Sequence, residues 1–247
     1  MLRTANPALT ANVFESVAYG ERSHTMTAQG ATTKTFVLLA VLLVAAGWVW
    51  KLFFQIGIQA VYPWVLGGVI AGLILALITI FAKRAAPVTA PLYAAAEGLA
   101  IGGLSALAES SFPGIVLQAV GLTFGTLFVL LFAYKARIIN VTDKFRMVVV
   151  AATGGICVVY LVTWILGFFG VSVPFIHGSG LVGIGFSIFV VIVAALNLVL
   201  DFDFIERGAQ AGVPKYMEWY AAFGLMVTLI WLYIEILRLL SKLRSRR

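Results

Sequence analysis

The amino-acid sequence predicts an all-α integral membrane protein, a bundle of seven transmembrane helices. The first observation is composition: 62% of the 247 residues are hydrophobic and 11% are charged, whereas soluble proteins carry about 25% charged residues. The second is the length of the uncharged stretches, since residues 147–200 contain no Asp, Glu, Lys or Arg. A bilayer core needs about 20 apolar residues per helix. The chain therefore crosses a membrane several times.

Charged residues, prolines and glycines divide the apolar sequence into spans. The stretch 147–200 must hold two helices, and "GVSVPFIHGSG", Gly170 to Gly180, supplies the break between them. "SSFPG", Ser110 to Gly114, separates two earlier spans in the same way. The predicted spans are residues 35–54, 60–82, 90–108, 114–134, 147–169, 179–202 and 216–240. They leave a polar N-terminal segment, 1–34, and a basic C-terminal tail, 241–247.

The formal net charge of +7 points to lipid headgroups and not to nucleic acid, because the Lys and Arg residues lie between the spans and at the C-terminus. If the N-terminus lies inside, the outer loops contain only Lys51, which agrees with the positive-inside rule. The basic tail 241–247 conflicts with that rule, because seven spans place it outside. Either the last segment re-enters the membrane and returns, or the earlier spans outweigh the late charges.

Three pairs of glycines have the G-x-x-x-G spacing that lets helix backbones approach closely. They are Gly68 with Gly72, Gly98 with Gly102, and Gly121 with Gly125. The spacing predicts close packing inside the bundle, and the alternative is a moving or dimerising interface.

Acidic side chains inside the spans are the candidate functional residues, since a charge at the bilayer centre costs roughly 2.5–3.5 kcal/mol. Glu97 lies well inside the third span with no basic residue nearby in sequence. It is a candidate proton-linked or cation-linked carboxylate. The alternative is a protonated acid that is hydrogen-bonded across helices.

More acids end the sixth span, in "NLVLDFDFIERGAQAG". If the helix persists, Asn197 and Asp201 share one face, and Asp203 and Glu206 share another. Their oxygen atoms suit Ca²⁺ or protons, and Asp201 with Asp203 is the candidate Ca²⁺ site. The alternative is a solvated helix end that leads into a loop.

The seventh span carries the remaining acids. Glu218 stands in its first turn, where the helix dipole favours a negative charge. Glu235 and Arg238 are three residues apart and are predicted to form a structural ion pair. The seventh span offers no aspartate partner for Asp201, as an intramembrane aspartyl protease would need, and no Ser–His pattern is present. The sequence therefore predicts a protein that is not an enzyme and has no cofactor, with Ca²⁺ as a candidate bound ion.

Several segments resemble the Bax inhibitor-1 family, in its bacterial YccA-like branch. The resemblance is strongest in "AALNLVLDFDFIERGA" and "YMEWYAAFGLMVTLIWLYIEILRLL", and it extends to "NPALTANVFE", "APLYAAAEGLAIGGLSA" and "FPGIVLQAV". It implies a multi-pass protein of the bacterial cell (inner) membrane that forms a pH-sensitive Ca²⁺ leak through a seven-helix bundle.

The resemblance implies a gating site, since in the better-known branch of the family an aspartate ending the sixth helix pairs with an aspartate in the seventh and the pair gates the pore. Asp201 matches the first position. The second position lies about ten residues before a closing arginine, and counting back from Arg238 reaches Thr228, which does not titrate. The chain departs from the family here, and Asp203, Glu218 or Glu97 is the candidate replacement for the missing acid.

Three functions are consistent with this sequence. The first is a passive Ca²⁺ or H⁺ leak. The second is a non-conducting regulator that binds a membrane protease or another membrane protein, with the polar N-terminal segment as a contact. The third is a secondary transporter, which is disfavoured because no pair of broken helices stands out in corresponding halves.

Overall fold

The computed structural model describes residues 24–169, 178 and 180–246, and this part of the chain is helical throughout, with short connections. Its helices are α2 (Ala28–Ile56), α3 (Ile58–Phe81), α4 (Ala86–Ser111), α5 (Ile115–Lys135), α6 (Asp143–Phe168), α8 (Leu181–Gln210) and α9 (Met217–Ser245), with a short 3₁₀ helix, η1 (Lys83–Ala85), before α4. All seven α-helices are long and apolar enough to cross a membrane. The predicted seven-span, all-α class is confirmed for the described residues.

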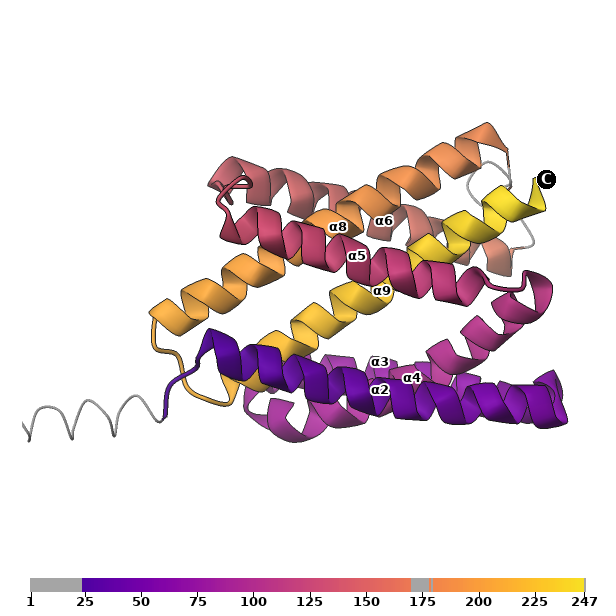
Figure 1. The fold of residues 1–247 in the computed structure, drawn as a ribbon, viewed down its shortest axis with the longest axis horizontal. Coiled ribbons are helices and arrows are strands. Elements are labelled where there is room, and N and C mark those ends of the chain that lie inside the picture. The colour runs from indigo at the N-terminus through magenta and orange to yellow at the C-terminus, as the bar shows by residue number, and fades with distance from the viewer. Residues whose placement is uncertain (1–23, 170–177, 179, 247) are drawn as a thin grey trace, which may run out of the picture.

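The helices run alternately up and down, so the bundle has two ends (Figure 1). We call the end where α2 begins the N-terminal end, and the end where α9 finishes the C-terminal end. Helix α9 runs diagonally through the middle and packs against α2, α4, α5 and α8. Large apolar side chains such as Val44, Phe81 and Leu117 are exposed on the outside. An outward apolar surface of this kind suits contact with lipid.

Several helices extend beyond the predicted spans. Helix α2 begins at Ala28, where the Thr27 side chain accepts a hydrogen bond from Gly30 N at 2.9 Å. Helix α8 continues through the acidic stretch to Gln210, so Asp201, Asp203 and Glu206 all lie on helix. The alternative of a helix end that leads into a loop at these acids is therefore wrong.

The basic C-terminal tail is also helical, since α9 is one continuous helix to Ser245. The alternative of a last segment that re-enters and returns is therefore wrong. The described part of the tail lies at the opposite end of the bundle from the start of α2 (Figure 1). Residues 1–23 of the polar N-terminal segment and most of the predicted break at 170–180 lie outside the described residues.

Two of the three glycine pairs make close helix contacts. A Cβ atom at Gly102 would lie 2.5 Å from the Ala46 carbonyl oxygen of α2, and one at Gly68 would lie 2.6 Å from the Ala96 carbonyl oxygen of α4. A Cβ atom at Gly121 would meet nothing within 4 Å. The packing prediction is confirmed for the pairs on α3 and α4, whereas the pair on α5 faces away from its neighbours.

We expect Gly102→Val to destabilise the bundle by about 3 kcal/mol, the upper part of the range for overpacked sites, because the obstructing atoms are backbone. The matched control is Gly121→Val, which adds the same side chain at an open position of α5. The measurement is thermal unfolding in detergent, followed by circular dichroism. Equal midpoints for the two variants would contradict the close approach of α2 and α4.

Candidate functional site

Asp201 occupies the contact between α8 and α9. The residue as a whole is half-buried, but its Oδ2 atom is fully buried and has no hydrogen-bond partner within the described part of the chain. The Thr228 side chain of α9 lies against this carboxyl group. The residue found by counting back from Arg238 thus lies directly against Asp201. An unpaired buried polar atom is costly, so this position calls for a functional explanation.

The Thr228 hydroxyl can serve only one acceptor, because it has a single proton. Its Oγ1 atom lies 3.3 Å from the Gly224 carbonyl oxygen, the ordinary acceptor within a helix. If the proton goes to Gly224, the bond to Asp201 requires a protonated carboxyl group as donor. If the proton goes to Asp201, an ionised carboxylate is the acceptor. The same contact can therefore accommodate both charge states of Asp201.

Asn197, predicted to share a face with Asp201, has partners on a different helix. Its side-chain amide donates to Thr153 Oγ1 of α6 at 2.8 Å and to the Val193 carbonyl oxygen at 2.9 Å. Asp201 meets α9 while Asn197 meets α6. The structure does not bring the two side chains into one site.

Asp203 is an ion-pair residue at the N-terminal end of the bundle. Arg146 Nη2 of α6 lies 2.8 Å from its Oδ2 atom, and Arg207 Nε lies 2.9 Å from the same atom. Two cations already balance this carboxylate, which joins α8 to α6. The structure does not bring Asp201 and Asp203 together as Ca²⁺ ligands. Within the residues that it describes, no group of three or more His, Cys, Asp and Glu side chains could hold a metal ion.

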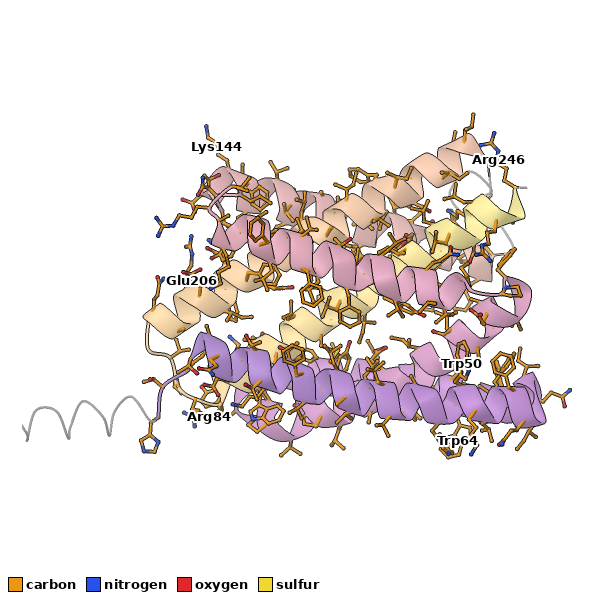
Figure 2. All side chains as sticks on the ribbon, viewed as in Figure 1. Trp50, Trp64, Arg84, Lys144, Glu206 and Arg246 are labelled. Atoms are coloured by element: carbon orange, nitrogen blue, oxygen red, sulfur yellow. The ribbon has the colours of Figure 1, made fainter. Side chains whose placement is uncertain are left out.

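Glu206 lies at the same end of the bundle, where Figure 2 labels it. The Tyr134 hydroxyl of α5 donates to Glu206 Oε2 at 2.7 Å, and Gln210 donates to Oε1 at 3.4 Å. At this end of α8, Asp203 therefore contacts α6 and Glu206 contacts α5.

Glu97 lies half-buried on α4, where that helix meets α3. A Cβ atom at Gly72 would lie 2.7 Å from Glu97 Oε1, so the absence of a side chain at Gly72 makes room for the carboxyl group. Tyr93, one turn earlier on α4, lies next to this carboxyl group. Because Tyr93 and Glu97 lie on the same helix, this contact is not the hydrogen bond across helices that the alternative predicted.

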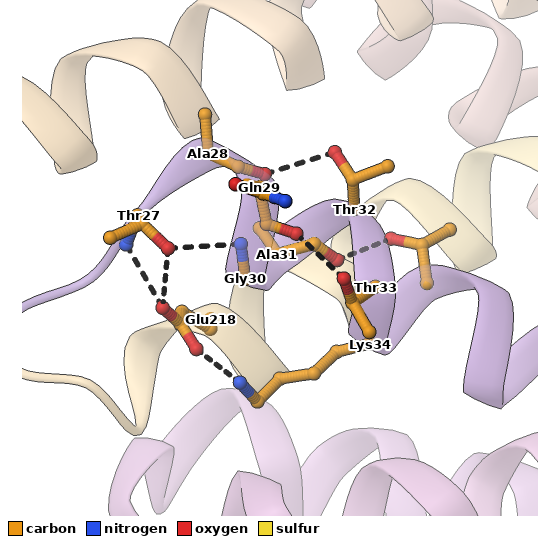
Figure 3. Close-up of polar contacts among 10 residues, drawn as sticks. Thr27, Ala28, Gln29, Gly30, Ala31, Thr32, Thr33, Lys34 and Glu218 are labelled. Carbon is orange, nitrogen blue, oxygen red and sulfur yellow. Dashed lines mark hydrogen bonds and ion pairs between the residues drawn. The ribbon is translucent and has the colours of Figure 1, made fainter.

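Glu218 joins the first and last helices (Figure 3). Its side chain is 1% exposed, and its Oε1 atom accepts hydrogen bonds from Thr27 N at 2.9 Å and Thr27 Oγ1 at 3.0 Å. The Lys34 ammonium group of α2 pairs with Oε2 and also lies 5.6 Å from the centre of the Trp219 ring. The lysine and the Thr27 donors use both carboxylate oxygens, so Glu218 fixes the start of α9 to α2.

We expect Lys34→Met to lower the free energy of unfolding by about 3–5 kcal/mol, because it leaves the buried Glu218 charge without its cation. The double variant Lys34→Met with Glu218→Gln should recover part of this loss, since no unpaired charge remains. Thermal unfolding in detergent measures both. If the double variant is less stable than the single one, the loss at Lys34 does not come from an unpaired charge.

Glu235 and Arg238 form an ion pair with 2.9 Å between Nη1 and Oε1, as their spacing predicts. The Tyr160 hydroxyl of α6 donates to Glu235 Oε1 at 3.0 Å and accepts from Arg238 Nη1 at 2.7 Å. Glu235 is 1% exposed. The pair therefore serves as an anchor between α9 and α6 near the C-terminal end.

We expect Tyr160→Phe to cost about 1–3 kcal/mol, because buried Glu235 loses a donor. Tyr62→Phe is the matched control, since Tyr62 lies 66% exposed on α3. Thermal unfolding is again the measurement. An unchanged midpoint for Tyr160→Phe would show that the hydroxyl adds nothing to the anchor.

The sequence reasoning missed the partners of these acids and one buried cation. Lys242, 6% exposed, donates to the Gly183 carbonyl oxygen at 3.0 Å and to Ser187 Oγ at 2.9 Å, which connects the end of α9 to the start of α8. Its only sequence signal was its place in the basic tail.

None of Asp203, Glu218 and Glu97, the candidate replacements for the missing acid, takes the place beside Asp201, where Thr228 lies.

Residues 6–245 of the chain match the model of a family described as "Bax inhibitor 1 like". No curated protein matches the chain, and no solved structure matches it.

Proposed function

Because the chain belongs to the Bax inhibitor 1 like family, we propose that it is a pH-sensitive leak for Ca²⁺ or another cation, with Asp201 as the group that responds to pH. The observation that carries the proposal is the buried Oδ2 atom of Asp201, which has no hydrogen-bond partner in the described chain. We place the protein in the bacterial inner membrane with the N-terminal end of the bundle in the cytoplasm, since that orientation follows the positive-inside rule.

In the proposed closed state, protonated Asp201 donates to Thr228 and holds α8 against α9. Loss of the proton leaves a negative charge in an apolar contact between two helices, which is unfavourable unless water or a cation reaches it. A switch of this kind requires only a few kcal/mol between two packings. The cation flux is therefore expected to rise as the pH rises.

The mechanism uses one carboxyl group at the contact between α8 and α9. Thr228 contributes a hydroxyl group that can accept the proton of Asp201 in the closed state. The other acids near the ends of α8 and α9 have structural partners: Asp203 has two arginines, Glu206 has Tyr134 and Glu218 has Lys34. These contacts support a structural role for those three residues. Asp201 is chosen over Glu97 because its buried Oδ2 atom has no partner in the described chain.

The test is Ca²⁺ flux through purified protein in liposomes that hold a Ca²⁺ indicator, from about pH 5 to about pH 8. Empty liposomes prepared in the same way measure the background. The proposal predicts a flux above background that increases with pH. Background flux at every pH, from protein that circular dichroism shows to be folded, would contradict it.

A second candidate is a non-conducting regulator that binds a membrane protease or another membrane protein. Two features favour it. Acids such as Glu218 and Asp203 form ion pairs that join one helix to another. The cavity between α2, α4, α5 and α9 is lined almost entirely by apolar side chains. Deletion of residues 1–23 distinguishes the candidates. A regulator would lose partner binding with no flux in either form, whereas a leak would retain its flux.

A further inference from the structure

A cavity of about 260 Å³ lies between α2, α4, α5 and α9, and we call it the α2–α5 cavity. Its floor is formed by α4 and α9, through Ile101, Met226, Leu229 and Ile230, which are all at most 8% exposed. The floor belongs to the main core of the bundle. The cavity is therefore a recess into the core and not a surface irregularity.

The cavity opens sideways between α2 and α5. Both helices line it, yet they share no substantial interface in the described chain. Leu43, 58% exposed, and Gly47, also exposed, form the rim on α2. Trp50 lines the end nearer the C-terminal end of the bundle, on the side of α2 that faces α5 (Figure 2). The opening thus lies near the middle of α2, a helix long and apolar enough to cross a membrane.

The polar groups in the cavity wall are already bonded to protein. Ser105 Oγ and Tyr233 Oη lie 2.7 Å apart, and the Thr123 hydroxyl donates to the Ala119 carbonyl oxygen at 2.8 Å. A buried water needs two to four polar partners, so water fits this recess poorly. An empty recess would lose the dispersion contacts of its lining atoms. Hydrocarbon, which surrounds the opening in a bilayer, satisfies both constraints.

We infer that the α2–α5 cavity is a binding site for one acyl chain of a phospholipid from the leaflet at the C-terminal end of the bundle. Lys51 follows Trp50 directly and is exposed at that end of α2. Its ammonium group is placed to attract the lipid phosphate, because lysine side chains near helix ends extend to the headgroup region. An apolar lining, a lateral opening and a terminal cation are together the chemistry of a phospholipid site.

The bound chain would support α9 from the side opposite α8. Met226, Leu229 and Ile230 face the cavity, whereas Thr228 contacts Asp201. Lipid in the cavity would thus hold α9 in the position that the Thr228–Asp201 contact requires. The binding site itself does not depend on whether the protein conducts ions.

The test uses the full-length protein in phosphatidylcholine nanodiscs that contain a small share of phosphatidylcholine with a diazirine in mid-chain. Illumination attaches the lipid to the residues that it touches, and mass spectrometry locates the adducts. The inference predicts adducts on the floor residues Ile101, Met226 and Ile230, which a chain reaches only by entering the cavity. Adducts confined to exposed residues, such as Leu73 on α3, would overturn it.

Gly47→Phe tests the route of entry, because a Cβ atom at Gly47 meets nothing within 4 Å and the ring would occupy the cavity. Floor adducts should fall by at least about tenfold, while adducts at Leu73 stay unchanged. Gly121→Phe, at an open position of α5 outside the cavity, should leave both unchanged. Equal floor labelling in Gly47→Phe and Gly121→Phe would overturn the site. Gly47→Leu provides the same comparison if the phenylalanine variant does not fold.

Discussion

Replacing Asp201 by Asn is expected to abolish the dependence of cation flux on pH. The amide retains the shape of the side chain and can bond to Thr228, but it has no proton to lose between about pH 5 and about pH 8. Helices α8 and α9 should therefore stay in the closed packing at every pH. We expect flux at the highest pH to fall by at least about tenfold, which corresponds to a loss of about 1.4 kcal/mol in the opening equilibrium.

The matched control is Glu206→Gln, an acid-to-amide change five residues further along α8. Its carboxylate bonds to Tyr134 of α5 and to Gln210 of its own helix, so its pH profile should match that of the unchanged protein. Asp203→Asn is a poor control because it unbalances Arg146 and Arg207. A normal pH profile in Asp201→Asn would remove Asp201 from the mechanism.

Thr228→Asp is expected to shift the pH dependence of cation flux to higher pH, because it places a second carboxyl group against Asp201. Two adjacent carboxylates in a low-dielectric contact share one proton and titrate as a pair. Release of that proton leaves two like charges together, so it becomes harder than in the unchanged protein. We expect the pH of half-maximal flux to rise by at least about one unit.

The control for this variant is Thr228→Asn, which has a similar size and no titratable proton. It should leave the pH of half-maximal flux where it is, although it can change the amplitude. If Thr228→Asp and Thr228→Asn behave alike, residue 228 does not act on flux through its charge. If both lose all flux but fold, the contact between α8 and α9 is essential for a reason other than titration.

The sequence was sufficient to predict the seven spans, because apolar run length decides them. Thr228 was found as the counterpart of Asp201 only through the resemblance to the family, by a count back from Arg238. The helix ends were less predictable, because a helix can leave the bilayer without ending. Helix α8 reaches Gln210 since its acids find partners on α5 and α6, and α9 reaches Ser245 since Lys242 is bonded to α8.

The roles of the individual acids depended on residues far away in the chain. Glu218 pairs with Lys34, which lies 184 positions away, and Glu206 accepts from Tyr134, 72 positions away. No local pattern reports such partners. The sequence left open whether Asp203 and Glu206 lie on a helix, and only the packing of α5, α6 and α9 separates their structural roles from that of Asp201.

The most direct test of the central claim is a measurement of the proton on Asp201 that does not rely on ion flux. Difference infrared spectroscopy of the protein in lipid, recorded between about pH 5 and about pH 8, detects the carbonyl stretch of protonated carboxylic acids. We predict a band that disappears as the pH rises and that is missing from Asp201→Asn but present in Glu206→Gln. A spectrum of Asp201→Asn with the same pH-dependent band as the unchanged protein would contradict the claim that Asp201 is the group that responds to pH.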